Sequence, residues 1–219
     1  MTDVRENCER ILERVHQAAA RSGRDPNSVR LIAVTKTVPA ERIRQAVECG
    51  IGHVGENRLQ EALPKRDQLR DLSLIWHFIG HLQTNKAKKV VENFDWVQSV
   101  DRNDLAGKLN QAASTTLSVL IEVKLHDEAG KSGVAPEDLR SLVEQFSHYD
   151  RLQLRGLMAI PPFFENAEDA RPHFRRLREL AAGLDLTELS MGMSHDFEVA
   201  IEEGATMVRI GSALFGERQ

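Results

Sequence analysis

The sequence is poor in cysteine, with Cys8 and Cys49 as its only two thiols among 219 residues. Two cysteines cannot form a disulfide framework, and their spacing matches no metal-binding pattern. Cys8 falls on the apolar side of a predicted helix, and Cys49 directly precedes Gly50, which ends another. We therefore expect two reduced thiols, as is usual for a cytoplasmic protein.

Long apolar runs are also absent. No segment approaches the roughly 18–20 apolar residues that cross a bilayer, and the charged N-terminus lacks the apolar core of a secretory signal. A net charge of -4 argues against the broad basic surface that binds nucleic acid or anionic membranes. Hydrophobic and charged fractions of 41% and 28% are those of an ordinary globular protein with a substantial core. We expect a cytoplasmic protein that binds neither nucleic acid nor membrane.

The chain has no linker rich in glycine, proline or serine, no low-complexity run and no short repeat. We therefore expect residues 1–219 to form a single domain. Its first part, residues 1–22, is predicted to be a helix, because apolar residues recur at helical spacing from Cys8 to Ala18 and Gly23 ends the pattern.

After this helix, short apolar segments alternate with longer amphipathic ones, which is typical of strands and helices around a parallel sheet. The eight predicted strands are residues 31–36, 51–57, 74–80, 95–100, 117–123, 151–160, 186–192 and 205–211. Eight strands, each followed by a helix, are what a closed (β/α)8 barrel of the TIM type requires. The alternative, an open doubly wound sheet, usually has a glycine-rich turn after its first strand, and here that turn reads TKTVPAE. The sequence thus favours an α/β fold, a compact single (β/α)8 barrel with an extra N-terminal helix.

Lys36 ends the first predicted strand. The run before it should be buried on both faces, so Lys36 emerges at the carboxyl end of the strand, where barrel active sites lie. If it shares a face with Ile32 and Val34, its amine points toward the barrel mouth. Partial desolvation there favours the neutral amine that attacks aldehydes. Taken alone, a strand-end lysine that reaches back to water is the more common explanation.

Two later segments are typical of phosphate binding. Ser194 lies in the loop after the seventh predicted strand, and Gly211 and Ser212 follow the eighth. Barrels often hold phosphate in these two loops, at a helix N-terminus. We expect Ser194 to cap the helix HDFEVAIEE, Gly211 to let the backbone approach an anion, and Ser212 to add a donor. Capping and turn chemistry could explain either segment alone, but both occur where phosphate is expected.

Arg209 lies between Val208 and Ile210 in an otherwise apolar predicted strand. A permanent charge in that environment needs a partner. An ion pair with a carboxylate of a neighbouring strand would supply one. A contact with a bound ligand is the alternative that we favour.

Seven segments resemble the pyridoxal phosphate homeostasis proteins, single-domain relatives of the alanine racemase N-terminal barrel. They are AVTKTVP, GENRLQE, WHFIGHLQTNK, DEAGKSG, RGLMAIPP, LSMGMSHDFEVAI and TMVRIGSALFGER. They follow the family's order from residue 33 to residue 218, and HFIGHLQTNK and SMGMSxDxxxAI are long and particular. Departures are slight: His195 fills a variable place, and Ser212 stands where threonine is also common.

The resemblance implies that pyridoxal 5′-phosphate is held as a Schiff base on Lys36. Arg209 would approach the pyridine nitrogen, Asn57 would lie beside the hydroxyl edge of the ring, and the loops after the last two strands would bind the phosphate. The cofactor-binding residues that the resemblance implies are Lys36, Asn57, Gly192, Met193, Ser194, Arg209, Gly211 and Ser212. His81 and Lys131 fall in matching motifs without a definite role.

The resemblance favours binding over catalysis. A protonated pyridine ring is the usual electron sink of pyridoxal enzymes, and a cationic arginine beside the ring nitrogen disfavours that protonation. Racemases of the related fold also use an arginine, but they supply a tyrosine acid/base from a second domain and a partner subunit. The only tyrosine here, Tyr149, precedes the sixth predicted strand, so we expect it at the opposite end of the barrel. We expect a monomer that buffers pyridoxal phosphate or delivers it to apo pyridoxal enzymes, in intracellular vitamin B6 homeostasis.

Two other functions remain open. The first is a pyridoxal-dependent amino-acid racemase, and the second is a Schiff-base aldolase in which Lys36 attacks a ketone and the last two loops hold a substrate phosphate. A metal site is not expected, because His53, His77 and His81 have no acidic partners at ligand spacing.

Overall fold

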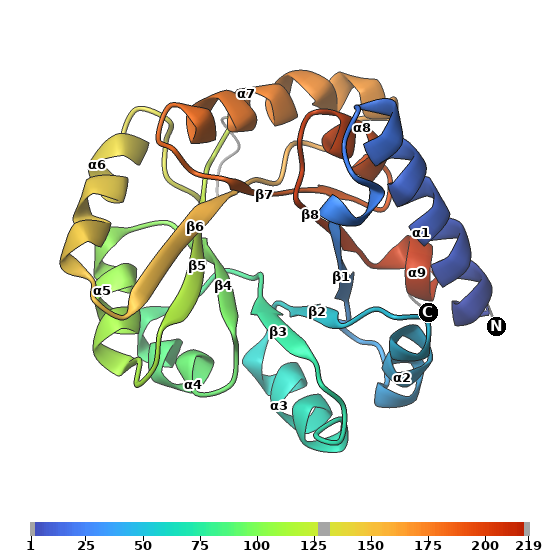
Figure 1. Cartoon of the computed structure of the whole chain (residues 1–219). Coiled ribbons are helices and arrows are strands. Elements are labelled where there is room, and N and C mark those ends of the chain that lie inside the picture. Colours follow the sequence, from blue (N-terminus) through green and yellow to red (C-terminus); the bar gives the residue numbers. More distant parts are fainter. Residues whose placement is uncertain (1–2, 127–131, 217–219) are drawn as a thin grey trace.

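Eight parallel strands close into one barrel, in which each strand pairs with its neighbours in the chain and β8 pairs with β1 (Figure 1). The structure, a computed structural model, describes residues 3–126 and 132–216. The strands are β1 (Arg30–Val34), β2 (His53–Glu56), β3 (Ile75–Phe78), β4 (Trp96–Val100), β5 (Leu117–Glu122), β6 (Leu152–Met158), β7 (Glu188–Met193) and β8 (Met207–Ile210). Each overlaps one predicted segment, so the predicted (β/α)8 barrel is confirmed and the open sheet is wrong.

The helices lie on the outside of the barrel (Figure 1). Those between and after the strands are α2 (Ala40–Glu48), α3 (Leu59–Gln68), α4 (Ala87–Val91), α5 (Asn103–Ala112), α6 (Leu139–Gln145), α7 (Arg171–Ala182), α8 (Phe197–Glu202) and α9 (Ser212–Phe215). Short 3-10 turns are η1 (Pro26–Ser28), η2 (Thr84–Lys86), η3 (Phe146–His148) and η4 (Ala167–Ala170). No helix in the described ranges is both long enough and apolar enough to span a membrane.

The predicted N-terminal helix is confirmed as α1 (Val4–Arg21). The side chain of Asp3 accepts a hydrogen bond from the Arg5 amide at 2.8 Å, which caps the helix. The apolar face of α1 packs along α8 and α9 on the outside of the barrel (Figure 1). Cys8 is fully buried on that face, and burial with the neighbouring Cys49 raises the pKa of the Cys8 thiol to about 12. Both cysteines are free thiols, and the raised pKa favours the less reactive protonated form of Cys8.

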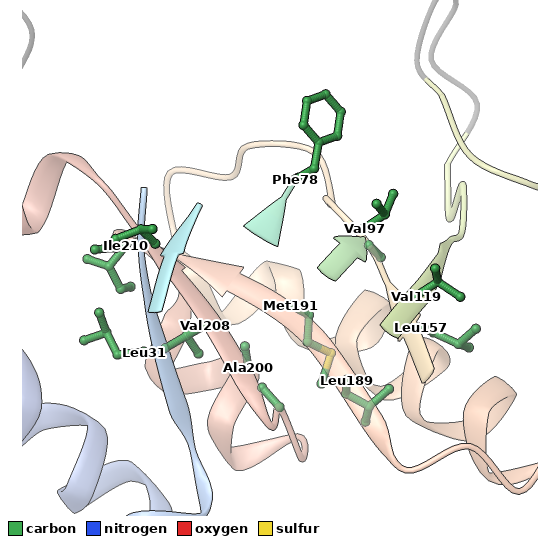
Figure 2. Close-up of a cluster of buried hydrophobic side chains, with 14 of the residues drawn as sticks. Leu31, Phe78, Val97, Val119, Leu157, Leu189, Met191, Ala200, Val208 and Ile210 are labelled. Carbon is green, nitrogen blue, oxygen red and sulfur yellow. The ribbon is translucent and has the colours of Figure 1, made fainter. Parts of the chain in front are cut away.

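Strand side chains alternate between two apolar layers. The outer layer packs between strands and helices, and Figure 2 shows part of it, including Leu31, Val119 and Val208. The inner layer is small, and its buried members are Ile32, Leu120, Met158 and Met207. Since few apolar side chains fill the interior, polar residues occupy much of the remaining space. The buried polar residues of the strands include His77, Gln98, Ser190 and Arg209.

Candidate functional site

Lys36 lies in the turn directly after β1. The amide of Thr35 still donates to the Gly55 carbonyl of β2 at 3.0 Å, so the strand alternation that turns Ile32 inward continues to Lys36. Thr37 then adopts a φ of 62°, which β-branched residues rarely do, and its amide donates to Glu61 of α3 at 3.1 Å. The turn therefore places a half-buried Lys36 at the carboxyl end of the barrel, as predicted.

Behind this turn lies a buried ion pair that the sequence did not reveal. Lys65 of α3 donates to Glu56 Oε1 at 2.7 Å and to the Thr35 carbonyl at 2.5 Å. The Thr35 hydroxyl donates to the same carboxylate oxygen at 2.7 Å. Glu56 is fully buried, whereas 13% of the Lys65 side chain is exposed. The residue before Lys36 is thus fixed from two sides.

Asn57 follows β2 and lies one strand away from Lys36. Its Oδ1 atom is buried, and no described residue donates a hydrogen bond to it. Gly80 packs against Asn57 so closely that a Cβ there would lie 2.5 Å from the Asn57 carbonyl oxygen. A cavity of about 240 Å³ adjoins Asn57 and is also lined by His81 and Lys86. A buried side-chain carbonyl without a hydrogen-bond partner destabilises the folded state. The position of Asn57 Oδ1 therefore suits a ligand that donates a hydroxyl proton to it.

The two predicted phosphate loops meet in space. Ser194 Oγ accepts hydrogen bonds from the amides of Gly211 at 3.3 Å and Ala213 at 3.2 Å. Gly211 itself lies beside the end of β1, since a Cβ on it would be 3.5 Å from that of Val34. Ser212 is exposed at the same place. The Ser194 hydroxyl and two amides therefore converge next to the strand that carries Lys36.

The expectation that Ser194 caps the following helix is wrong. Asp196 precedes α8, and its Oδ1 accepts from the Met193 amide at 2.7 Å. The reason is an irregularity in β7, where Ser190 pairs with Met207 but Met193 pairs with Arg209, so one extra residue bulges out. The bulge redirects Ser194 toward β8.

Gly192 makes this bulge possible. Its φ is 91°, a conformation that favours glycine. A Cβ at this position would lie 2.5 Å from the Cβ of Ala200 and 3.0 Å from the Cα of Phe197, both in α8. Gly192 and Met193 therefore shape the loop that carries Ser194.

Arg209 is buried in the barrel interior, with 3% of its surface exposed. Its NH1 group donates to Ser190 Oγ at 2.7 Å and its NH2 group to the Ala159 carbonyl at 3.0 Å. Within the described part of the chain no carboxylate forms an ion pair with it. Desolvation lowers the pKa of Arg209 to about 10, while Glu122 and Asp196 oppose the shift. The guanidinium thus stays protonated at neutral pH without the structural ion pair that we considered.

Glu122 ends β5 and is the titratable carboxyl that acts most strongly on Arg209. Burial and the nearby charge of Asp101 raise the pKa of Glu122 from 4.5 to about 7, although Arg209 acts in the opposite direction. The folded protein therefore binds a proton on Glu122 more tightly than the unfolded chain does. Its contribution to stability is full below pH 4.5 and is lost as the pH rises through 7.

Glu122→Gln should accordingly stabilise the ligand-free protein at pH 8 by about 3 kcal/mol. The difference should disappear below pH 4.5, because the wild-type carboxyl is then neutral in both states. Urea unfolding at the two pH values measures this difference in the free energy of unfolding. Glu92→Gln at the exposed end of α4 controls for the lost charge. A variant that is no more stable than the wild type at pH 8 would contradict the raised pKa.

Three other residues singled out in the sequence are His81, Lys131 and Tyr149. His81 is exposed, and its Nδ1 lies 2.9 Å from the Ser132 hydroxyl. Lys131 lies outside the described residues. Tyr149 packs on Phe146 and donates to Asn103 Oδ1 at 2.6 Å, contacts that place it among the outer helices.

The family model of the alanine racemase N-terminal domain matches residues 7–219. The pyridoxal phosphate homeostasis protein of Aquifex aeolicus is 49% identical over 98% of both chains. The chain belongs to the pyridoxal phosphate homeostasis protein family. Among solved structures, PipY of Synechococcus elongatus with PLP bound is 43% identical, with a TM-score of 0.82 over 92% of this chain and 100% of PipY. The likeness to Corynebacterium glutamicum alanine racemase, 17% identical with a TM-score of 0.69, covers 99% of this chain and 61% of the racemase and concerns the fold alone.

Proposed function

We propose that this protein binds pyridoxal 5′-phosphate as a Schiff base on Lys36 and serves intracellular vitamin B6 homeostasis without strong catalytic activity. In this role a cytoplasmic monomer would buffer the reactive aldehyde or pass it to apo pyridoxal enzymes. Membership of the homeostasis family and the likeness to PipY with PLP bound support the proposal. The arrangement of groups around Lys36 supports it independently.

The observation that carries the proposal is the order of groups around the barrel. Because β8 pairs with β1, Lys36 is flanked by Asn57 on the β2 side and by Gly211 on the β8 side. Pyridoxal phosphate carries its hydroxyl, its aldehyde and its phosphate arm on three consecutive ring carbons. Around the barrel the order is the Asn57 acceptor, the Lys36 amine and the phosphate loop at Gly211. This order matches that of the hydroxyl, the aldehyde and the phosphate arm on the ring.

Each group has a defined task in this proposal. Lys36 would hold the aldehyde carbon as a Schiff base, with loss of water, Asn57 Oδ1 would accept from the ring hydroxyl, and Ser194, Gly211 and Ser212 would hold the phosphate with hydroxyl and amide donors. Gly192 and Met193 line that loop. Arg209 would approach the ring nitrogen from the interior.

The charge of Arg209 would weaken the electron sink of a bound cofactor, as it does in the racemases of the related fold. When bound, pyridoxal phosphate supplies an electron sink that is strongest with its ring nitrogen protonated. A guanidinium with a pKa near 10 keeps its proton at neutral pH and repels a second one at that nitrogen. Tyr149, the only tyrosine, hydrogen-bonds to Asn103. Because the racemases share the arginine, the engagement of Tyr149 with Asn103 is the observation that favours a binding protein.

An absorption spectrum before and after borohydride reduction tests this function. Purified protein, reconstituted with pyridoxal phosphate, should show the long-wavelength band of a protonated Schiff base. Reduction should abolish the band and leave a stable adduct on the peptide that contains Lys36. Protein that stays colourless with added cofactor would contradict the proposal and favour the Schiff-base aldolase.

Glu122 supports a second candidate, the amino-acid racemase, because a carboxyl with a pKa of about 7 is suited to general acid–base catalysis. Incubation of the loaded protein with α-deuterated L- and D-amino acids separates the two functions. We expect complete retention of deuterium. Exchange at enzymatic rates that Glu122→Gln abolishes would instead establish the racemase.

A further inference from the structure

Five polar side chains from five strands form a continuous hydrogen-bonded chain through the barrel interior, which we call the interior chain. Arg209 NH1 donates to Ser190 Oγ at 2.7 Å, and Ser190 Oγ donates to Gln98 Oε1 at 2.7 Å. Gln98 Nε2 lies 3.0 Å from His77 Nδ1. His77 Nε2 lies 3.0 Å from His53 Nδ1. Ser190, Gln98 and His77 are all fully buried.

The chemistry of the groups gives this interior chain one direction. Arginine can only donate hydrogen bonds, so Ser190 accepts from Arg209 and donates its own hydroxyl proton to Gln98 Oε1. The Gln98 amide nitrogen then donates to His77 Nδ1, which must be unprotonated. His77 consequently carries its proton on Nε2 and donates it to His53.

The histidines at the far end favour this direction. Burial lowers the pKa of His77 well below its usual value, with smaller contributions from His53 and Arg30. Burial and Arg30 also lower the pKa of His53, which Asp95 partly offsets. Both rings are therefore neutral at pH 7, each with one donor and one acceptor nitrogen. The Trp96 ring stacks on the His77 ring, with their centroids 5.5 Å apart, and this contact fixes the plane of the imidazole.

A long arginine side chain needs such support to keep one orientation. Its rotamer freedom is among the largest of all side chains, and it has no ion pair among the described residues to restrain it. Ser190 and the Ala159 carbonyl hold the two terminal nitrogens. The buried Ser190 hydroxyl accepts from Arg209 and needs an acceptor for its own proton. Gln98 provides that acceptor. Ile32 and Met158, two other buried side chains of the interior, are apolar and offer no hydrogen bond.

We propose that Ser190, Gln98 and His77 are positioning residues that orient Arg209 toward the ring nitrogen of the bound cofactor. The inference rests on the proposed function, because it assumes that Arg209 meets that ring. It goes further by assigning a ligand-directed task to three residues that do not touch the ligand. Loss of one link should loosen the guanidinium and thereby change both the affinity and the protonation of the bound ring.

Ser190→Ala tests the first link in the full-length protein, with pyridoxal phosphate titrated by absorbance across the pH range. We expect the dissociation constant to rise about tenfold, as for the loss of one hydrogen bond to a charged group. The pH midpoint of the Schiff-base band should also shift, which a purely structural role would not cause. Ser190→Thr keeps the hydroxyl and should restore both properties.

Gln98→Met breaks the chain one link further on, with a side chain of similar length, and guards against a folding defect confined to position 190. Thr206→Val is the matched control. The Thr206 hydroxyl donates to Glu188 at 2.6 Å outside the interior chain, so its loss should lower the melting temperature and leave affinity and pH midpoint unchanged.

Nitrogen-15 spectra of the histidine rings in ligand-free protein test the direction of the interior chain independently. We expect a neutral His77 protonated on Nε2, with altered shifts in Gln98→Met. A His77 protonated on Nδ1 would overturn the proposed direction.

Two failures can be told apart. If Ser190→Ala and Gln98→Met bind cofactor with wild-type affinity and pH midpoint while the Lys36 adduct still forms, the positioning role is wrong and the proposed function stands. If wild-type protein takes up no pyridoxal phosphate, both proposals fall.

Discussion

Replacement of Lys36 with alanine is expected to abolish the borohydride-trapped pyridoxal adduct completely. The reduced adduct requires a primary amine at the site, and the turn after β1 places Lys36 between Asn57 and the loop of Gly211. Weak non-covalent binding should survive in Lys36→Ala, because the donors at Ser194 and the charge of Arg209 remain. Peptide mapping by mass spectrometry after reduction measures the loss.

The competitor for this assignment is Lys65. Its amine lies 2.5 Å from the carbonyl of Thr35, the neighbour of Lys36, but it is engaged with the fully buried Glu56. An adduct on Lys65 in otherwise wild-type protein would refute the assignment. Lys36→Arg keeps the positive charge and should also lose the adduct. Lys89→Arg, on the exposed side of α4, should retain it.

Much of the fold follows from local patterns. All eight strands and α1 agree with the sequence prediction because the alternation of apolar segments reflects burial on both faces of a parallel sheet. The positions of Lys36, Gly211 and Arg209 follow in turn, since each lies on or directly after a strand whose ends the pattern locates. These features depend only on strand order and closure of the barrel.

The orientation of Ser194 could not be predicted in the same way. Its direction depends on the bulge at Gly192, where β7 gains a residue relative to β8. A glycine in a strand permits a bulge without specifying one. The alternation of side chains is lost at that point, and only the packing of Gly192 against Ala200 reveals the outcome.

The interior chain depends on contacts across the barrel. His53, His77, Gln98, Ser190 and Arg209 come from five strands that span residues 53–209, and no local spacing connects them. Their link becomes visible only once the barrel is closed and each inward face is known. The sequence did single out Arg209, because a charge between two apolar residues is informative by itself.

The ion pair between Glu56 and Lys65 yields the second large prediction, which concerns stability. Glu56→Ala should lower the free energy of unfolding by about 3–5 kcal/mol, because it leaves a largely buried ammonium without its partner. A domain of ordinary stability has about 5–15 kcal/mol in total, so the loss should be obvious in urea denaturation. The matched control is Asp71→Ala, which removes an exposed pair with Arg44 and should cost far less, because solvent screens exposed charges.

The double variant Glu56→Gln/Lys65→Met separates the worth of the pair from the cost of breaking it. Removal of both charges leaves no uncompensated ion, so much of the stability lost in Glu56→Ala should return. The Thr35 hydroxyl can still donate to the oxygen of the new glutamine, as it does to Glu56 at 2.7 Å. If Glu56→Ala cost no more than Asp71→Ala, the pair would not stabilise the turn before Lys36. If instead the double variant were stable but bound cofactor weakly, the pair would serve mainly to hold that turn in place, and its two charges would be a requirement of the site.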